Sequence, residues 1–270
     1  MSTVLKITNL HQIFEKGTIN ENHVLKGINL EIESGDFITI IGGNGAGKST
    51  LLNSIAGAIP TETGKIELNG QDITKQSVVK RSGQISRVFQ DPKLGTAVRL
   101  TVEENMAIAL KRGQKRGFSS GVKAKNREFF REQLQSLNLG LENRLTAEIG
   151  LLSGGQRQAI TLLMATLVRP ELILLDEHTA ALDPKTSATV MDLTNRLIQE
   201  HQLTAFMVTH DMNDAIKYGN RLIMLHQGQI VVDVKGKAKE KLTVPELMEM
   251  FQKNSGSQLD DDKLLLTKIE

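Results

Sequence analysis

The sequence predicts an α/β fold with a mainly parallel sheet, an N-terminal antiparallel β-subdomain and an inserted α-helical subdomain. Three observations predict it. Short β-type runs alternate with helical patterns, as in proteins with parallel sheets. The first two runs, 4–10 and 24–32, alternate apolar and polar residues, which is typical of strands with one solvent-exposed face. No convincing strand is found over 91–150, so this stretch is expected to be helical.

The first half of the core begins with a buried strand. Phe37–Ile41 is a nearly continuous apolar run, which is typical of a central strand covered on both faces. In the helical insert, Thr101–Glu104 has the spacing of a capping box, and Ala124–Leu137 has a helical pattern. The other elements expected before residue 90 are a helix, a hairpin-type turn and a strand: Lys48–Ala56, Asn69-Gly70 and Ile85–Phe89.

The α/β pattern resumes after residue 150. Ser153–Gln156 has capping-box spacing and begins a helix that is expected to run to Leu167. Asp183 and Pro184 form an N-cap followed by proline at the first helical position. Residues 255–262 are polar and are expected to be loose. The strands expected here are Leu172–Leu175, Leu203–Val208, Arg221–Leu225 and Ile230–Val234, and Thr243–Glu246 caps a last helix.

Composition excludes several classes of protein. The chain has 270 residues, 33 Lys and Arg against 31 Asp and Glu, and no cysteine. A net charge of +2 argues against binding of nucleic acid through an overall positive charge of the protein. The absence of cysteine rules out disulfides, zinc-thiolate sites and a cysteine nucleophile. With no long apolar run and no secretory pattern near Met1, we expect a cytoplasmic protein.

A phosphate-binding loop is the first motif that carries chemistry. Gly42–Ser49 fits the pattern G-x-x-x-x-G-K-[ST] and lies between an expected strand and an expected helix. Its glycines let successive backbone N–H groups face phosphate oxygens, and the helix N-terminus adds partial positive charge. Lys48 would reach the β- and γ-phosphates, and the Ser49 hydroxyl would bind Mg²⁺. The alternative is that Gly42–Ser49 is a glycine-rich turn without a ligand, which the strand before it and the helix after it disfavour.

Two carboxylates follow a buried strand. Asp176 and Glu177 come directly after Leu172–Leu175, so they lie at the carboxyl edge of the sheet, where ligands bind in such folds. Asp176 would hold Mg²⁺ through water, and Glu177 would orient or deprotonate the attacking water. Without the phosphate loop, Asp176 and Glu177 would be interpreted simply as the solvated end of a strand.

The third motif is the pentapeptide Leu152–Gln156. Gly154 and Gly155 at a helix start expose N–H groups to an anion, and Ser153 adds a hydroxyl. Taken alone, this motif would only be a helix cap.

In this order, the three motifs resemble those of the ATP-binding cassette (ABC) ATPases, whose core is a P-loop NTPase fold. The resemblance spans about residues 4–233. It implies a single ABC ATPase domain over 1–235 and a short C-terminal extension over 236–270. Within the domain, residues 1–90 and 151–235 would form the ATP-binding core, and 91–150 the helical subdomain.

The resemblance gives roles to four further residues. Gln90 is similar to the Q-loop glutamine, which binds metal or water, and Asp183 to the D-loop aspartate. His210 is similar to the switch histidine, and Phe14 to the aromatic that stacks on adenine. Without the motifs, Gln90 would be loop filler, His210 a polar strand end and Phe14 a core or edge aromatic.

The implied site divides into groups. The nucleotide-binding residues are Phe14, Asn44, Gly45, Ala46, Gly47, Lys48, Ser49 and Thr50. The catalytic residues are Glu177, His210, Lys48 and Gln90, and the magnesium ligands are Ser49, Gln90 and Asp176. The signature residues, supplied by the opposite chain, are Ser153, Gly154, Gly155 and Gln156.

Two positions depart from the family pattern. Gly43 stands where proline is more usual, and His178 replaces the proline that often follows the Asp-Glu pair. His178 has two open interpretations, a place near the nucleotide or simple packing. The strings Asp176–Asp183 and Phe14–Asn22 resemble a subset of bacterial importer cassettes proposed to serve tryptophan, tyrosine or related organic solutes.

The resemblance implies a transport ATPase. Two cassettes, in a homodimer or a mixed pair, would close around two ATP with Mg²⁺ and drive separate integral-membrane permease subunits, more in keeping with solute import. A solute-binding protein would be a further partner, and the location would be the cytoplasmic face of the cell membrane. The alternatives are an ABC-type ATPase acting on nucleic acid or ribosomes, which the near-neutral charge disfavours, and a non-hydrolysing scaffold.

Two basic stretches are expected to be solvated. They are the tail run 235–241 and the cluster Lys111, Arg112, Lys115, Arg116 and Lys123.

Overall fold

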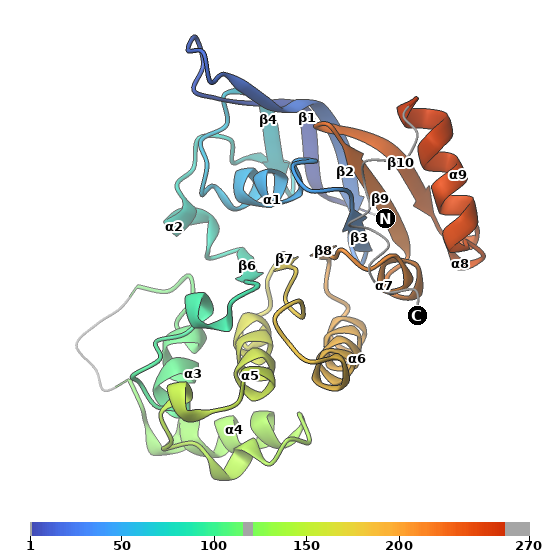
Figure 1. Cartoon of the computed structure of the whole chain (residues 1–270). Helices are drawn as coiled ribbons and strands as arrows, with labels where there is room; N and C mark the ends of the chain where they lie inside the picture. Colours follow the sequence, from blue (N-terminus) through green and yellow to red (C-terminus); the bar gives the residue numbers. More distant parts are fainter. Residues whose placement is uncertain (1, 116–120, 257–270) are drawn as a thin grey trace. The chain divides into compact units, whose positions relative to one another are not determined.

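A computed structural model describes residues 2–115 and 121–256 (Figure 1). The chain divides into two compact units. The first unit contains Met1–Arg81 and Thr204–Glu270, and the second contains Ser82–Leu203. Residues 116–120 and the part of the expected loose segment after Gly256 lie outside the described residues.

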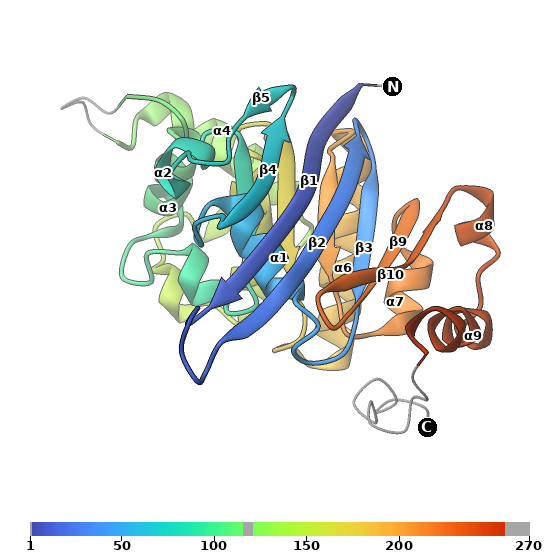
Figure 2. The same ribbon diagram turned by 90° about the horizontal axis from the view of Figure 1, so that it is seen from above.

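The first unit carries the antiparallel sheet expected near the N-terminus. The strand order is β2-β1-β4-β5. Leu5 and Ile7 of β1 are buried and lie opposite Leu68 and Ile66 of β4, which gives the sheet one apolar face. Figure 2 shows β1, β2 and β4 crossing over the helix α1. The strands are β1 (Thr3–Phe14), β2 (Asn22–Glu33), β4 (Thr63–Leu68) and β5 (Gln71–Asp72), and α1 is Lys48–Ala56.

A second set of strands in the same unit has the order β10-β9-β3-β8. β3 is parallel to both β8 and β9, and β10 is antiparallel to β9. Every residue of β3 is buried, as the apolar run predicts. The strands are β3 (Phe37–Ile41), β8 (Ala205–Val208), β9 (Arg221–His226) and β10 (Gln229–Lys235).

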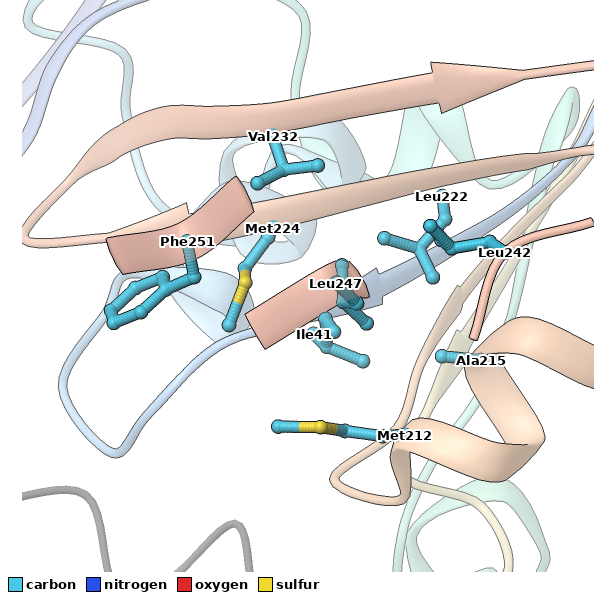
Figure 3. Packing of buried hydrophobic residues seen from close by; sticks show 9 residues of the cluster. All are labelled: Ile41, Met212, Ala215, Leu222, Met224, Val232, Leu242, Leu247 and Phe251. Atoms are coloured by element: carbon cyan, nitrogen blue, oxygen red, sulfur yellow. The ribbon is translucent and has the colours of Figure 1, made fainter. Parts of the chain in front are cut away.

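The described part of the C-terminal extension packs onto the first unit. Leu247 and Phe251 of α9 (Val244–Ser255) are buried beside α7 (Met212–Lys217), β9 and β10 (Figure 3). The short helix α8 (Lys237–Glu240) precedes α9. The cluster comprises Ile41, Met212, Ala215, Leu222, Met224, Val232, Leu242, Leu247 and Phe251. Since Ile41 ends β3 and Met212 begins α7, the extension supports both of these chain segments.

The second unit pairs two parallel strands with helices. β6 (Ile85–Val88) and β7 (Leu172–Asp176) lie side by side with Val88 opposite Leu175. Between residues 91 and 150 the described chain forms no strand, only one isolated bridge between Thr101 and Glu148, which agrees with the expected helical insert. The helices are α3 (Val102–Leu110), α4 (Ala124–Gln135), α5 (Gly154–Thr166) and α6 (Pro184–Glu200), with α2 (Val78–Arg81) in the first unit.

The predicted helix starts are confirmed in this unit. Thr101 accepts a hydrogen bond from the backbone N–H of Glu104, and the Glu104 carboxylate accepts from Thr101, which completes a capping box. Predicted helix and strand ends differ from the observed ones by one or two residues: α4 ends at Gln135 rather than Leu137, α5 at Thr166 rather than Leu167, and β6 at Val88 rather than Phe89.

Candidate functional site: a phosphate loop, a carboxylate pair and a signature turn

The phosphate loop joins β3 to α1 and needs glycine at specific positions. Gly42, Gly45 and Gly47 have positive φ angles of 151°, 77° and 102°, a region that other residues rarely adopt. A Cβ on Gly42 would lie 2.3 Å from the carbonyl oxygen of Leu225, and one on Gly47 would lie 2.8 Å from Leu25 Cδ2. The loop can therefore hold this shape only with glycine at these close contacts.

Lys48 lies folded over the same loop. Its Nζ donates to the carbonyl oxygens of Gly42 at 2.6 Å and Gly43 at 3.1 Å, and the residue is 8% exposed. α1 begins with Gly47 as N-cap, with no capping side chain and no acidic residue in its first turn. The ammonium and the first N–H groups of α1 thus place positive charge around the loop, which suits a phosphate.

Two other predicted residues belong to the same unit as the loop. His210 is exposed and follows β8, and the N–H of Thr209 bonds to the carbonyl of Ile40 at 3.0 Å. Because β3 and β8 are parallel, the loop and His210 leave the sheet at the same edge. Phe14 ends β1 opposite Asn22 and is 37% exposed, so its side chain is accessible rather than part of the core.

The carboxylate pair lies in the second unit. Asp176 ends β7, and its Oδ2 accepts a hydrogen bond from Arg87 Nη2 at 2.6 Å. Glu177 has a φ angle of 45°, a left-handed conformation that costs a non-glycine residue about 1 kcal/mol. Gln90 is exposed two residues after the end of β6. Since β6 and β7 are parallel, Gln90 and the two carboxylates lie at one edge of this strand pair.

The donor set suits magnesium. A hydroxyl, an amide and a carboxylate oxygen (Ser49, Gln90 and Asp176) are the hard ligands that Mg²⁺ prefers. The described residues contain no cluster of three His, Cys, Asp or Glu side chains that could hold a metal.

The signature turn forms the predicted cap of α5. Ser153 Oγ accepts from the N–H of Gln156 at 3.2 Å, and Gln156 Oε1 accepts from the N–H of Ser153 at 3.3 Å. Ser153 and Gly154 are exposed, whereas a Cβ on Gly155 would lie 2.2 Å from Thr186 Cγ2. Because Ser153 Oγ accepts within its own helix, its exposed hydroxyl proton is still free to be donated to another acceptor.

Sequence reasoning missed the residue that fixes this turn. Arg157 is 9% exposed and donates to the carbonyl oxygens of Ile149, Gly150 and Leu152 at 2.9–3.2 Å. A buried guanidinium with three carbonyl acceptors holds the chain that leads into Ser153 in place. The signal in the sequence was only a charged residue on an otherwise apolar helix face.

Asp183 is the N-cap of α6, as predicted. Its side chain accepts from the N–H of Thr186 at 3.1 Å, and hydrogen bonds from Thr186 lower the pKa of the Asp183 carboxyl. The carboxylate is therefore charged at neutral pH and sits at the positive end of a helix.

Comparison with known proteins gives the family. The ABC transporter family model matches residues 25–180. The tyrosine transport ATP-binding protein of Clostridioides difficile (strain R20291) is 45% identical over 249 residues, which cover 92% of this chain and 99% of the relative. The chain belongs to the ABC transporter family. It is the ATP-binding and ATP-hydrolysing subunit of an ABC transporter.

Other relatives agree with this assignment. The methionine import ATP-binding protein MetN 2 of Enterococcus faecalis (strain ATCC 700802 / V583) is 34% identical over 91% of this chain and 69% of its own length. A solved structure of the cassette MJ0796, a dimer in a post-hydrolysis state bound to ADP and Pi, matches with a TM-score of 0.72 and 32% identity. That match covers 86% of this chain and 98% of the solved one. These relatives are transport proteins and do not support the nucleic-acid alternative.

His178, which departs from the ABC pattern, packs inside the second unit. The residue is 2% exposed, and its Nε2 lies 2.9 Å from Thr194 Oγ1 in α6. Burial lowers the pKa of His178 to about 4. Of the two interpretations left open, the geometry supports packing.

The expectation of solvated basic residues was wrong for Arg112 and Lys239, whereas Lys111, Lys115 and Lys123 are exposed. Arg112 is not simply solvated, because its guanidinium bonds to the carbonyl oxygens of Ala165 in the last turn of α5 and of Val168 just after it, and burial lowers its pKa. In the tail run, Lys239 is 2% exposed, and its ammonium bonds to the carbonyl oxygens that end α7. The sequence shows that these side chains are charged, but it does not show that they reach backbone carbonyl oxygens of residues distant along the chain. Arg116 lies outside the described residues.

No helix among the described residues has the length and apolarity needed to cross a membrane.

Proposed function

We propose that this ABC subunit binds ATP with Mg²⁺ on the Gly42–Ser49 loop and uses its hydrolysis to drive solute import through separate membrane subunits. The observation that carries the proposal is the loop itself: Lys48 folded over the carbonyls of Gly42 and Gly43, at a helix N-terminus without an acidic residue. The import direction is supported by the names of the tyrosine and methionine transport relatives.

Each site residue has a proposed role. Phe14 stacks on adenine, and residues Asn44 to Thr50 surround the phosphates. Bound Mg²⁺ would neutralise phosphate charge, with Ser49, Gln90 and Asp176 as the residues that hold it. Glu177 orients the attacking water and accepts its proton, and its strained backbone supports a functional role. His210 and Lys48 stabilise charge on the terminal phosphate.

A second cassette completes each site in this proposal. Ser153, Gly154, Gly155 and Gln156 of one chain contact the terminal phosphate held by the other, in a homodimer or a mixed pair. The exposed Ser153 hydroxyl and the helix start behind it support this role. Asp183, which caps α6, would face the partner cassette. Hydrolysis removes the charge that holds the cassettes together, so they separate.

Membrane permease subunits are the proposed partners of the second unit. Four large apolar side chains of this unit are exposed to solvent. The segments that carry Val98 and Leu151 lie next to each other, because the N–H of Gly150 bonds to the carbonyl oxygen of Val98 at 3.0 Å. The four are Leu94, Val98, Ile108 and Leu151, which are 71%, 37%, 42% and 78% exposed. Such side chains fit a protein interface. This docking would place the subunit on the cytoplasmic face of the cell membrane.

The proposed cargo is an amino acid of the tyrosine type or a related organic solute, delivered by a solute-binding protein. The support is the 45% identity to the tyrosine transport relative over nearly the whole of both chains. Cargo is recognised by the partner subunits, so the residues of this chain do not select it.

The experiment is Glu177→Gln with ATP and Mg²⁺. We expect ATP binding to be kept, hydrolysis to fall at least about a hundredfold, and a dimer to accumulate in size-exclusion chromatography. Glu171→Gln, an exposed carboxylate at the other end of β7, is the matched control and should hydrolyse ATP normally. Normal turnover by Glu177→Gln would remove Glu177 from its role. Reconstitution with the permease should then show ATPase activity stimulated by tyrosine-loaded binding protein.

A further inference from the structure

Arg87 contacts the metal-binding candidate Asp176 within the second unit. In the parallel register of β6 and β7, Arg87 lies opposite Leu174, two residues before Asp176. Side chains two residues apart in a strand project from the same face, so the two charged groups meet. Arg87 Nη2 donates to Asp176 Oδ2 at 2.6 Å. The sequence motifs assign no role to this arginine.

The pair is shielded from solvent. The side chains of Arg87 and Asp176 are 16% and 14% exposed, whereas the ion pair Arg131–Glu128 on α4 is 48% and 69% exposed. A carboxylate with so little contact to water needs a counter-charge, because an uncompensated charge there is costly. Arg87 supplies that charge.

The guanidinium has a second contact that does not depend on Asp176. Its central carbon lies 4.5 Å from the centre of the Phe89 ring, within the range of a cation–π interaction. The backbone of Phe89 is held in turn by Gln158 of α5, whose Nε2 donates to the Phe89 carbonyl oxygen at 3.2 Å. Gln158 is fully buried, so the backbone of Phe89 is held in place. The guanidinium can therefore move off Asp176 Oδ2 and keep a partner.

We propose that Arg87 is a positioning residue that neutralises Asp176 and competes with Mg²⁺ for its carboxylate. The inference rests on the proposed function, in which Asp176 holds Mg²⁺ through water. Arg87 already donates to Oδ2 of the carboxylate that would hold the metal-bound water, and two cations at one carboxylate repel each other. Arg87 thus raises the Mg²⁺ concentration needed for loading with nucleotide, and the contact with Phe89 gives the guanidinium a partner when it shifts away from the carboxylate.

The test measures Mg²⁺ dependence of binding rather than activity. A fluorescent ADP analogue is titrated at fixed concentration with MgCl₂, and the half-saturating Mg²⁺ concentration is read for wild type and Arg87→Gln. We expect that concentration to fall about fivefold in Arg87→Gln, the size of one partly shielded ion pair. Arg131→Gln, which breaks the exposed pair with Glu128, is the matched control and should match wild type.

Arg87→Lys provides a second variant. Lysine keeps the positive charge but lacks the planar guanidinium that stacks on Phe89 and can bond to a carboxylate through two N–H groups. We therefore expect the half-saturating Mg²⁺ concentration to fall by only about twofold. This variant also keeps the test decisive if Arg87→Gln does not fold. An unchanged or higher half-saturating Mg²⁺ concentration in whichever variant folds overturns the inference, the higher value meaning that Arg87 orients Asp176 for the metal.

Failure of the proposed function has a different outcome. If wild type binds the analogue with no dependence on Mg²⁺, the metal role of Asp176 fails and this inference fails with it. If wild type depends on Mg²⁺ and the Arg87 variants show the same dependence, only the inference about Arg87 fails. Binding of the analogue in EDTA, which reports the Gly42–Ser49 loop alone, should be equal in all variants.

Discussion

His178 Nε2 donates a hydrogen bond to Thr194 Oγ1, and the two atoms are 2.9 Å apart. The direction follows from the threonine, whose hydroxyl donates to the carbonyl oxygen of Val190 at 2.7 Å and so accepts from the ring. Burial lowers the pKa of His178 to about 4, so the histidine that replaces the usual proline is neutral at pH 7, and it ties the chain after β7 to α6.

This bond predicts a loss of stability in acid. The pKa of His178 is lowered to about 4 in the folded protein from 6.5, so the unfolded state binds the extra proton as pH falls through this range. Between pH 7 and pH 5 we expect His178 to reduce the free energy of unfolding by about 2 kcal/mol. Urea unfolding of His178→Gln should show a pH dependence smaller by this amount. His201→Gln, which alters an exposed histidine, should keep the wild-type dependence.

Gly47→Ala should damage the phosphate loop. The added Cβ would lie 2.8 Å from Leu25 Cδ2 at a φ angle of 102°, so the loop must shift. We expect nucleotide affinity to fall at least about tenfold and stability by about 1–2 kcal/mol. Gly17→Ala is the matched control, because Gly17 also has a positive φ but nothing lies within 4 Å of its Cβ. Equal nucleotide affinity in the two variants would show that the close contact is unimportant.

Arg157→Lys should weaken the signature turn without affecting the phosphate loop. A lysine cannot bond to the carbonyls of Ile149, Gly150 and Leu152 at once, so the turn before α5 loosens. In the Glu177→Gln background we expect ATP binding to persist while the ATP-dependent dimer is lost, as measured by size-exclusion chromatography. Arg131→Lys in that background should still dimerise, and a stable dimer with Arg157→Lys would argue against a role of this turn between chains.

Lys239→Met should destabilise the first unit. Its ammonium bonds to the carbonyl oxygens of Ile216, Tyr218 and Gly219, and a methionine would leave them without these donors. We expect a loss of about 2–3 kcal/mol in the free energy of unfolding. The exposed Lys237→Met is the control. If both variants unfold at the same denaturant concentration, the C-terminal extension contributes little through this residue.

The sequence predicted those parts of the site that depend on short spacings. The phosphate loop follows an apolar strand and precedes a helix, and the caps at Ser153, Thr101 and Asp183 join residues three positions apart. Such features form from neighbouring residues, because glycine conformations and helix caps are set by local backbone geometry. The fold class followed from the alternation of these elements, although most ends shifted by a residue or two and β1 ends at Phe14 rather than Leu10.

Only the tertiary structure decided which distant residues meet. Arg87 and Asp176 are 89 positions apart and pair because β6 and β7 lie parallel in one register. Lys239 reaches the carbonyls that end α7, and α9 covers the end of β3, because the extension folds back onto the first unit. Composition marked these residues only as charged or apolar. Strand register and helix packing, which depend on the whole core, gave each of them its partner.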